Sequence, residues 1–528
     1  MDTILTATPS GSRWVYRTLT FKVLPVGSIC PVEHADHAYL ITDNWDDWFE
    51  FSTMYTLIYV DSTNTKNAIG STKIGQFDMD KDQRRPKIPD EFESLDEKFF
   101  SVGQDDSFYE KLNSLGEFIR DKILSALNDI ALYENIYNKA IKERVTSTSL
   151  LRSVSHTSIK GQYRRLAKGD ARLSKYSFSY SSPIMIGTVS ERINLNFKVI
   201  PDSNPPTNIH VLIGRNGVGK THLMNNMISS LIDDNSMLSK VGKFTSLDEL
   251  EGELFSNVVS VTFSAFDETE PLPEKKDKSA GIQFSYVGLK RIKKASERYL
   301  PPKSPVILKN EFVKSILSCK AGGKIERWKR AVGKLESDPV FGDINVLSIL
   351  NNDDETEFKD VAGRLFKNLS SGHKIVLLTI TRLVESMEER SLVFLDEPEA
   401  HLHPPLLSAF IRSLSDLLTN RNAVSIIATH SPVVLQEVPR DCTWKLWRSG
   451  YISKVERLET ESFGENVGIL TREVFGLENT DSGFHNLLKD AVNKYDDYDA
   501  AVESFSGQLG VEARGILRAL FGIKSDQA

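Results

Sequence analysis

Ile209-His-Val-Leu-Ile-Gly-Arg-Asn-Gly-Val-Gly-Lys-Thr221 is the stretch that decides the fold of this chain. Its mostly apolar start predicts a buried strand, the glycines that follow predict a tight turn, and Lys220 begins a helix. This spacing is typical of a loop whose backbone N–H groups close around phosphates at the positive end of a helix. We therefore predict a nucleotide-binding loop made of the following residues: Gly214, Arg215, Asn216, Gly217, Val218, Gly219, Lys220 and Thr221.

A second apolar strand, Ser391-Leu-Val-Phe-Leu-Asp-Glu-Pro398, ends in two acids. Ligands of parallel α/β sheets bind beyond the carboxyl ends of the strands. Asp396 is therefore placed to hold Mg²⁺ together with the Thr221 hydroxyl, and Glu397 is placed to polarise an attacking water. An acidic pair after a strand can also do no more than cap a helix, but the glycine-rich loop favours the catalytic interpretation.

Two further segments flank the acidic strand. Asn368-Leu-Ser-Ser-Gly-His-Lys374 precedes an apolar helix, so Ser370 and Gly372 lie at a helix N-terminus, which attracts anions. By itself, Ser370 is also what an ordinary N-cap requires. Ala423-Val-Ser-Ile-Ile-Ala-Thr-His430 predicts another buried strand, and His430 at its end can contact a γ-phosphate, although a single histidine is more often structural.

Together and in this order, the four motifs resemble the ATPase heads of ABC proteins and of SMC-type DNA-repair clamps, over about residues 200–445. The resemblance implies an α/β P-loop ATPase head that binds ATP and Mg²⁺ and hydrolyses ATP. It also implies a site completed by a second copy of the chain. The implied roles are Mg·ATP binding for Lys220, Thr221 and Asp396, catalytic base for Glu397, switch histidine for His430, and contact in trans for Ser370 and Gly372.

The residues after Glu397 narrow the resemblance. They spell Pro-Glu-Ala-His-Leu-His-Pro404, which departs from the transporter pattern and looks like the OLD-family and related defence ATPases. His403 takes the place of a residue that communicates across the dimer in transporters. No glutamine clearly fits the Q-loop, since Gln283 is a poor candidate. The tail looks too short and too helical for the TOPRIM nuclease domain of OLD proteins, so the chain resembles PtuA, the ATPase of Septu and of certain retron anti-phage systems.

That narrower resemblance implies partners. It implies an HNH nuclease of the PtuB type, and in retron systems a reverse transcriptase with its multicopy single-stranded DNA. The chain would oligomerise and regulate that nuclease. The alternative from another class is a DNA-repair or chromosome-maintenance clamp whose own ATPase is stimulated by DNA, and a third is a nucleotide-dependent scaffold that hydrolyses little ATP.

Four regions follow from the pattern along the chain. Residues 1–90 are β-rich, and residues 91–176 predict helices followed by a basic connector. Residues 177–446 alternate strands, glycine turns and helices, which predicts the ATPase domain, with a helical insertion at about 268–365. Residues 447–528 predict a mostly helical tail.

Composition and charge indicate the cellular compartment of the protein and its kinds of partner. The net charge is −7, three cysteines lie far apart, and no apolar run approaches the length of a membrane span, so we expect a cytoplasmic protein without membrane contact. Lys290–Lys334 nevertheless carries fourteen Lys/Arg against three Glu. With Trp328 among these cations, the stretch predicts either a nucleic-acid contact or simply a solvated helical face.

Overall fold

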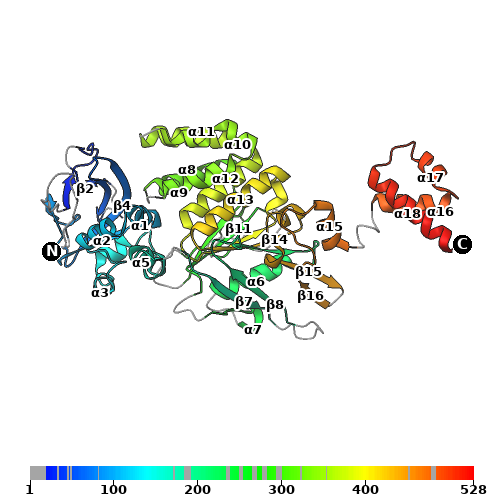
Figure 1. The fold of residues 1–528 in the computed structure, drawn as a ribbon, viewed down its shortest axis with the longest axis horizontal. Helices are drawn as coiled ribbons and strands as arrows, with labels where there is room; N and C mark the ends of the chain where they lie inside the picture. The colour runs from blue at the N-terminus through cyan, green and yellow to red at the C-terminus, as the bar shows by residue number, and fades with distance from the viewer. Residues whose placement is uncertain are drawn as a thin grey trace, which may run out of the picture.

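A seven-stranded sheet forms the centre of the molecule (Figure 1). The computed structural model describes residues 19–527 except 33–34, 45–46, 48–49, 81, 171–172, 184–191, 233–237, 249–253, 264–269, 276–281, 293–299, 322–323, 352–353, 450–451 and 477–482. The sheet order is β12 (Gln283–Gly288), β11 (Asn257–Thr262), β13 (Leu392–Asp396), β14 (Val424–Thr429), β9 (Ile209–Ile213), β15 (Thr443–Ser449) and β16 (Ile452–Glu456). All neighbours pair in parallel except β15 and β16. The predicted α/β class is confirmed.

The central strands are buried on both faces, as their continuous apolar runs require. Successive side chains alternate between two cores: Val211 and Ile213 face one, and Leu212 faces the other. The Leu212 side is covered by α6 (Lys220–Ile232) and by a three-stranded sheet of β10 (Lys243–Ser246), β7 (Tyr176–Ser181) and β8 (Asn194–Val199), with α7 (Leu238–Val241) after α6.

Helices cover the other face of the sheet, above it in Figure 1. They are α8 (Pro305–Ala321), α9 (Ile325–Leu335), α10 (Pro339–Ile344), α11 (Glu355–Asn368), α12 (Ser371–Ser386) and α13 (Pro404–Asn420), with the short turns η3 (Val346–Asn351) and α14 (Pro432–Leu435). The phosphate loop (residues 214–221) therefore leads into a helix on one face, while Ser370 begins a helix on the opposite face. The loop and Ser370 therefore begin helices that lie on opposite faces of the central sheet.

Two boundaries predicted for the ATPase domain, those of its insertion and of its C-terminal end, differ in the structure. β12 lies inside the stretch predicted as a helical insertion (268–365), yet it is the edge strand of the central sheet. The sheet also continues past residue 446 through β15 and β16, and α15 (Val467–Phe475) packs on the ATPase core through Leu470 and Val474. In the described part of the tail, α16 (Phe484–Lys494), α17 (Tyr498–Ser504) and α18 (Val511–Gln527) form a separate core at the C-terminal end (Figure 1).

The N-terminal module (residues 19–170) has its own six-stranded sheet and core. Its strands are β1 (Thr20–Leu24), β2 (His37–Thr42), β3 (Met54–Val60), β4 (Lys66–Gln76), β5 (Glu91–Phe92) and β6 (Phe99–Gly103). Its helices are α1 (Asp106–Ser114), α2 (Glu117–Ala126), α3 (Glu134–Ala140), α4 (His156–Ser158) and α5 (Arg164–Ala167), with π-turns η1 (Thr146–Leu150) and η2 (Ile159–Tyr163). The stretch predicted as a basic connector thus packs into this core, because Leu150, Ile159 and Tyr163 are buried in it.

Buried charges join the N-terminal module to the ATPase module. Arg327 of α9 pairs with Asp105 and Asp106 at the start of α1. Arg421, just after α13, lies 2.7 Å from the Asp106 carboxylate. All four side chains are almost fully buried, so they depend on one another for compensation of charge.

Candidate nucleotide site

The phosphate loop adopts a conformation that only glycine takes easily. Gly217 and Gly219 have φ of 82° and 99°, and a Cβ atom at either would meet nothing within 4 Å. Backbone conformation, rather than crowding, therefore requires glycine at these two positions. Their open side faces a cavity of about 470 Å³. Gly214 differs, since a Cβ there would collide with the carbonyl oxygen of Leu446.

Lys220 lies buried at the start of α6 with its ammonium turned back over the loop. Its Nζ donates to the carbonyl oxygens of Gly214 (2.8 Å) and Arg215 (3.1 Å). Burial lowers the pKa of Lys220, while the carboxylates of Glu397, Asp396 and Glu399 oppose that shift. Lys220 is thus a cation directed at the loop, where phosphate oxygens can replace carbonyl oxygens as acceptors.

The strand register brings the acidic pair to the same edge of the sheet as the loop. Asp396 pairs in register with Ala428, and Ala428 pairs with Leu212. Asp396 therefore lies two strand spacings, about 10 Å, from the end of β9. The hydroxyl of Thr221 and the carboxylate of Asp396 are hard oxygen ligands, the type that Mg²⁺ prefers. With the glycine cradle and Lys220, this donor set fits a magnesium-bound triphosphate.

Glu397 faces the cavity from an unusual backbone conformation. It is half-buried and lines the cavity together with Lys220 and Thr221. Its φ of 46° and ψ of 58° are left-handed, which is uncommon for a residue with a Cβ. Its N–H donates to the carbonyl oxygen of Ala428 at 2.8 Å, and Pro398 follows as the first residue of η4 (Pro398–His401). These two features hold the carboxylate at the cavity wall.

His430 lies beside two carboxylates. Its Nδ1 is 3.2 Å from Glu399 and 3.5 Å from Glu397. Glu399 also accepts hydrogen bonds from the backbone N–H of His430 (2.8 Å) and from the Thr429 hydroxyl (2.5 Å). Glu399 therefore fixes the end of β14 and the direction of the histidine.

The signature turn (residues 370–372) lies away from the cavity of its own chain. Neither Ser370 nor Gly372 lines that cavity, because α12 and α6 cover opposite faces of the sheet. Ser370 is exposed and caps α12, as its N-cap pattern predicts. Gly372 is buried against η4, where a Cβ atom would come within 2.8 Å of the His401 carbonyl oxygen. The structure thus places the turn beside the loop that follows Glu397.

Some lining residues escaped the sequence motifs. His222 and Asn225 of α6 line the cavity, but neither belongs to the phosphate-loop pattern. Glu399 was visible only as one letter of the Glu-Ala-His-Leu-His-Pro box. A second carboxylate two residues after Glu397 is the signal that could have identified it. Gln283 begins β12 at the opposite end of the strand from the cavity, which agrees with its poor fit to a Q-loop.

Comparisons with known proteins define the family. A family model described as an AAA domain and a candidate AbiEii toxin of a type IV toxin–antitoxin system matches residues 327–436. Protein ea59 of Escherichia phage lambda is 38% identical over 522 residues, which cover 95% of this chain and 98% of the relative. The chain belongs to the ea59 family.

Solved structures of ABC-type ATPases are more distant from this ea59-family chain. An ATP-binding cassette of an ABC transporter, in its ADP conformation, is 13% identical and has a TM-score of 0.31, over 59% of this chain and 100% of that chain. A Clostridium perfringens subunit of an ABC transporter complex is 16% identical with a TM-score of 0.27, over 58% and 93% of the two chains. The family model and the fold identify a P-loop ATPase of the ABC/AAA type, and the narrower resemblance to PtuA stays a prediction.

Several residues of the basic insertion of this ea59-family protein make internal contacts. Trp328 is fully buried and donates from Nε1 to the Thr381 hydroxyl at 2.9 Å, so it cannot stack on a base. Arg327 pairs with the N-terminal module, and Arg330 lies 3.5 Å from Asp416. The stacking role expected of Trp328 is therefore wrong, and contact of nucleic acid with the cations of Lys290–Lys334 stays a prediction. Lys293, Lys294 and Arg298 lie outside the described residues.

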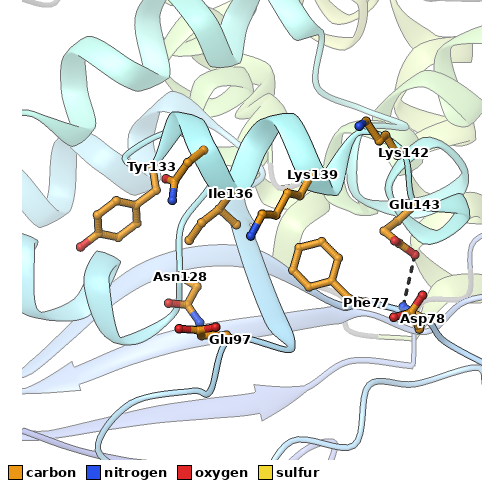
Figure 2. Close-up of a pocket in the computed structure, with 10 residues that line it drawn as sticks. Phe77, Asp78, Glu97, Asn128, Tyr133, Ile136, Lys139, Lys142 and Glu143 are labelled. Carbon is orange, nitrogen blue, oxygen red and sulfur yellow. Dashed lines mark hydrogen bonds between the residues drawn. The ribbon is translucent and has the colours of Figure 1, made fainter.

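A second hollow lies in the N-terminal module, with a volume of about 640 Å³ (Figure 2). Ile136 and Lys139 of α3 face Phe77 across it, and the Asp78 N–H donates to the Glu143 carboxylate at 3.4 Å. Its lining mixes acids, lysines and apolar groups, and it contains none of the predicted nucleotide-site residues.

Among the residues that the structure describes, no helix has the length and hydropathy needed to cross a bilayer.

Proposed function

We propose that this protein binds and hydrolyses Mg·ATP in a site that two copies of the chain complete together. The observation that supports the proposal is the division described above. Lys220, Thr221 and Glu397 share one cavity, whereas the exposed signature turn begins a helix on the other face of the sheet. The cavity would leave one side of a bound triphosphate uncovered. The resemblance implies that the exposed signature turn of a second copy covers that side.

Each residue of the site has its own role in the proposed binding and hydrolysis of ATP. The loop N–H groups and Lys220 bind and orient the phosphates at the N-terminus of α6. Mg²⁺, held by Thr221 and Asp396, would neutralise charge on the phosphate oxygens. Glu397 orients a water and accepts its proton, and His430, held by Glu399, donates to a phosphate oxygen beside it. The Ser370 turn from the second copy adds hydrogen-bond donors opposite the loop.

The cellular role is a further part of the proposal. We propose a cytoplasmic defence ATPase whose ATP-dependent oligomers regulate a separate HNH nuclease, with a reverse transcriptase and its DNA as further partners where a retron is present. The box from Glu399 to Pro404 supports this resemblance, and the matching family model carries a toxin–antitoxin description. Co-purification of the chain with the products of adjacent genes tests it: a stable complex with an HNH protein supports the role.

The second candidate remains a DNA-stimulated clamp. The lysines of α8, including Lys309 and Lys314, lie outside the buried pairs and favour it. Strong stimulation of phosphate release by DNA, without a nuclease partner, would support this role against the first.

Mixing two inactive variants tests the composite site. Lys220→Ala removes the ammonium group that binds the phosphates, and Ser370→Ala removes the hydroxyl of the signature turn. Each variant alone should therefore release little phosphate from ATP. In a mixed dimer, the Ser370→Ala chain supplies an intact loop and the Lys220→Ala chain supplies an intact turn. We expect an equal mixture to recover up to about a quarter of the wild-type rate, because half the dimers are mixed and each has one complete site. A mixture as inactive as its components contradicts a site shared between chains.

A further inference from the structure

Three polar side chains form a line from the surface into the ATPase module. The exposed Ser370 hydroxyl lies 2.6 Å from Nδ1 of His373. The buried ring of His373 places its Nε2 3.0 Å from Oδ1 of Asp338, which is also buried. Asp338 is held in turn, because Oδ1 accepts from the backbone N–H groups of Val340 and Phe341 at the start of α10. The only one of the three that a second molecule can reach is the serine.

The carboxylate determines which nitrogen of a neutral His373 carries the proton. Asp338 only accepts hydrogen bonds, so Nε2 must carry the hydrogen that points to it. Nδ1 is then an acceptor, and the Ser370 hydroxyl must donate to it. In that state the serine presents only lone pairs to its surroundings. A phosphate oxygen, which is also an acceptor, gains nothing from it.

A second proton on the ring reverses this polarity. With hydrogen on both nitrogens, Nδ1 donates to the serine oxygen and the hydroxyl hydrogen becomes free to point outward. The buried carboxylate of Asp338 lies 3.0 Å from Nε2 and can accept its hydrogen in either state of the ring. In the described part of the chain, the other titratable side chain against this pair is His403, whose Nε2 lies 3.6 Å from Oδ2 of Asp338 and whose ring centre is 6.3 Å from that of His373.

We propose that Asp338 and His373 act as positioning residues for Ser370, and that a proton taken up from solvent by Nδ1 of His373 releases the serine hydroxyl to donate to a triphosphate bound by a second copy. One proton moves from a solvent or buffer acid to Nδ1, so an N–H bond forms on the ring as the donor's bond to hydrogen breaks, and the serine hydroxyl rotates. The inference rests on the proposed composite site and names the chemistry that closes it. ATP-driven association is therefore coupled to proton uptake.

Calorimetry of ATP-driven association tests this coupling, with Glu397→Gln as the parent so that ATP is not consumed. Measurements in two buffers of different ionisation enthalpy count the protons, at mildly alkaline pH, where histidines are mostly neutral. We expect the parent to take up about one proton per bound ATP. We expect His373→Gln to associate with no uptake, since its amide can donate to Ser370 without titrating.

Two variants complete the design. His403→Gln is the matched control, because His403 faces Asp338 but does not contact Ser370; it should keep the uptake. Asp338→Asn keeps an oxygen for the α10 N–H groups, so it preserves the fold if His373→Gln does not, and it should reduce the uptake several-fold. Uptake that is unchanged in both His373→Gln and Asp338→Asn overturns this inference alone. A parent that binds ATP as a monomer overturns the composite site itself.

Discussion

Arg421, at the end of α13, places its guanidinium 2.7 Å from the carboxylate of Asp106, at the start of α1. Arg327 contacts the same carboxylate at 3.1 Å, and Gln162 donates to it at 3.1 Å. The N-terminal module is therefore joined to the ATPase module through groups that have left water. Such pairs add little beyond what well-packed apolar groups would give, but removing one partner leaves an uncompensated buried charge.

We expect Asp106→Ala to destabilise the protein by about 3–5 kcal/mol for this reason. The change should weaken the contact between the N-terminal module and the ATPase module. The two modules should then unfold at different denaturant concentrations, in two transitions. Glu355→Ala is the control, because it breaks an exposed pair with Lys359 and should cost about 0.5 kcal/mol or less. Equal losses in the two variants would contradict a special role for the buried pair.

Asp129 gives the N-terminal module a distinct pH dependence. Burial raises the pKa of this carboxyl to about 7. Because the folded pKa lies above the unfolded one, the folded state binds the proton more tightly. The group's contribution to stability is therefore full below about pH 4 and is lost as the pH rises through about 7.

Asp129→Asn should remove this decline while keeping the local hydrogen bonds. The amide oxygen can accept from the N–H groups of Ala131 and Leu132, and its NH₂ can donate to Tyr109. We expect the free energy of unfolding of the variant to change less between pH 4 and 7 than that of the wild type, as measured by urea titration. Asp61→Asn is a control whose pKa shift has the opposite direction, since hydrogen bonds from Thr63 lower the pKa of the Asp61 carboxyl. Parallel pH profiles for Asp129→Asn and wild type would contradict the assignment.

The geometry around the candidate nucleotide site was the most predictable part of the fold, because its sequence signals are local. The loop from Gly214 to Thr221 and the strand ending at Asp396 each combine a buried strand with polar residues at its carboxyl end. The joining of the two modules was not predictable. Asp106 and Arg421 lie more than three hundred residues apart, and nothing in either local sequence indicates the other.

The misinterpretation of Trp328 has a different cause. Cations on both sides suggested a nucleic-acid surface, but Trp328, Ala331, Val332 and Leu335 recur at helical spacing and form the buried stripe of α9. That periodicity was present in the sequence and predicts the core. Arg327 was harder to place, since a buried arginine needs a partner that only the tertiary fold supplies.

Glu397→Gln should separate binding from turnover. The amide has nearly the shape of the carboxylate but cannot accept a proton from water, so phosphate release should fall about 100- to 10,000-fold. Binding of ATP should persist, because Lys220 and the loop N–H groups are unchanged. Lys220→Ala is the opposite control, which should lose binding. Normal phosphate release by Glu397→Gln would remove its assigned role.

Glu399→Ala tests whether the position of His430 matters as much as its presence. The change removes the acceptor for the His430 N–H and the Thr429 hydroxyl, and it leaves the cavity lining intact. A small displacement of a catalytic group can reduce the rate by up to about 100-fold, so we expect kcat to fall while KM changes little. Glu399→Gln keeps an oxygen acceptor and should recover much of that loss. Because both residues act on one contact, adding His430→Ala to Glu399→Ala should lower kcat no further than His430→Ala alone. Losses that multiply in the double variant would show that Glu399 acts independently of the histidine.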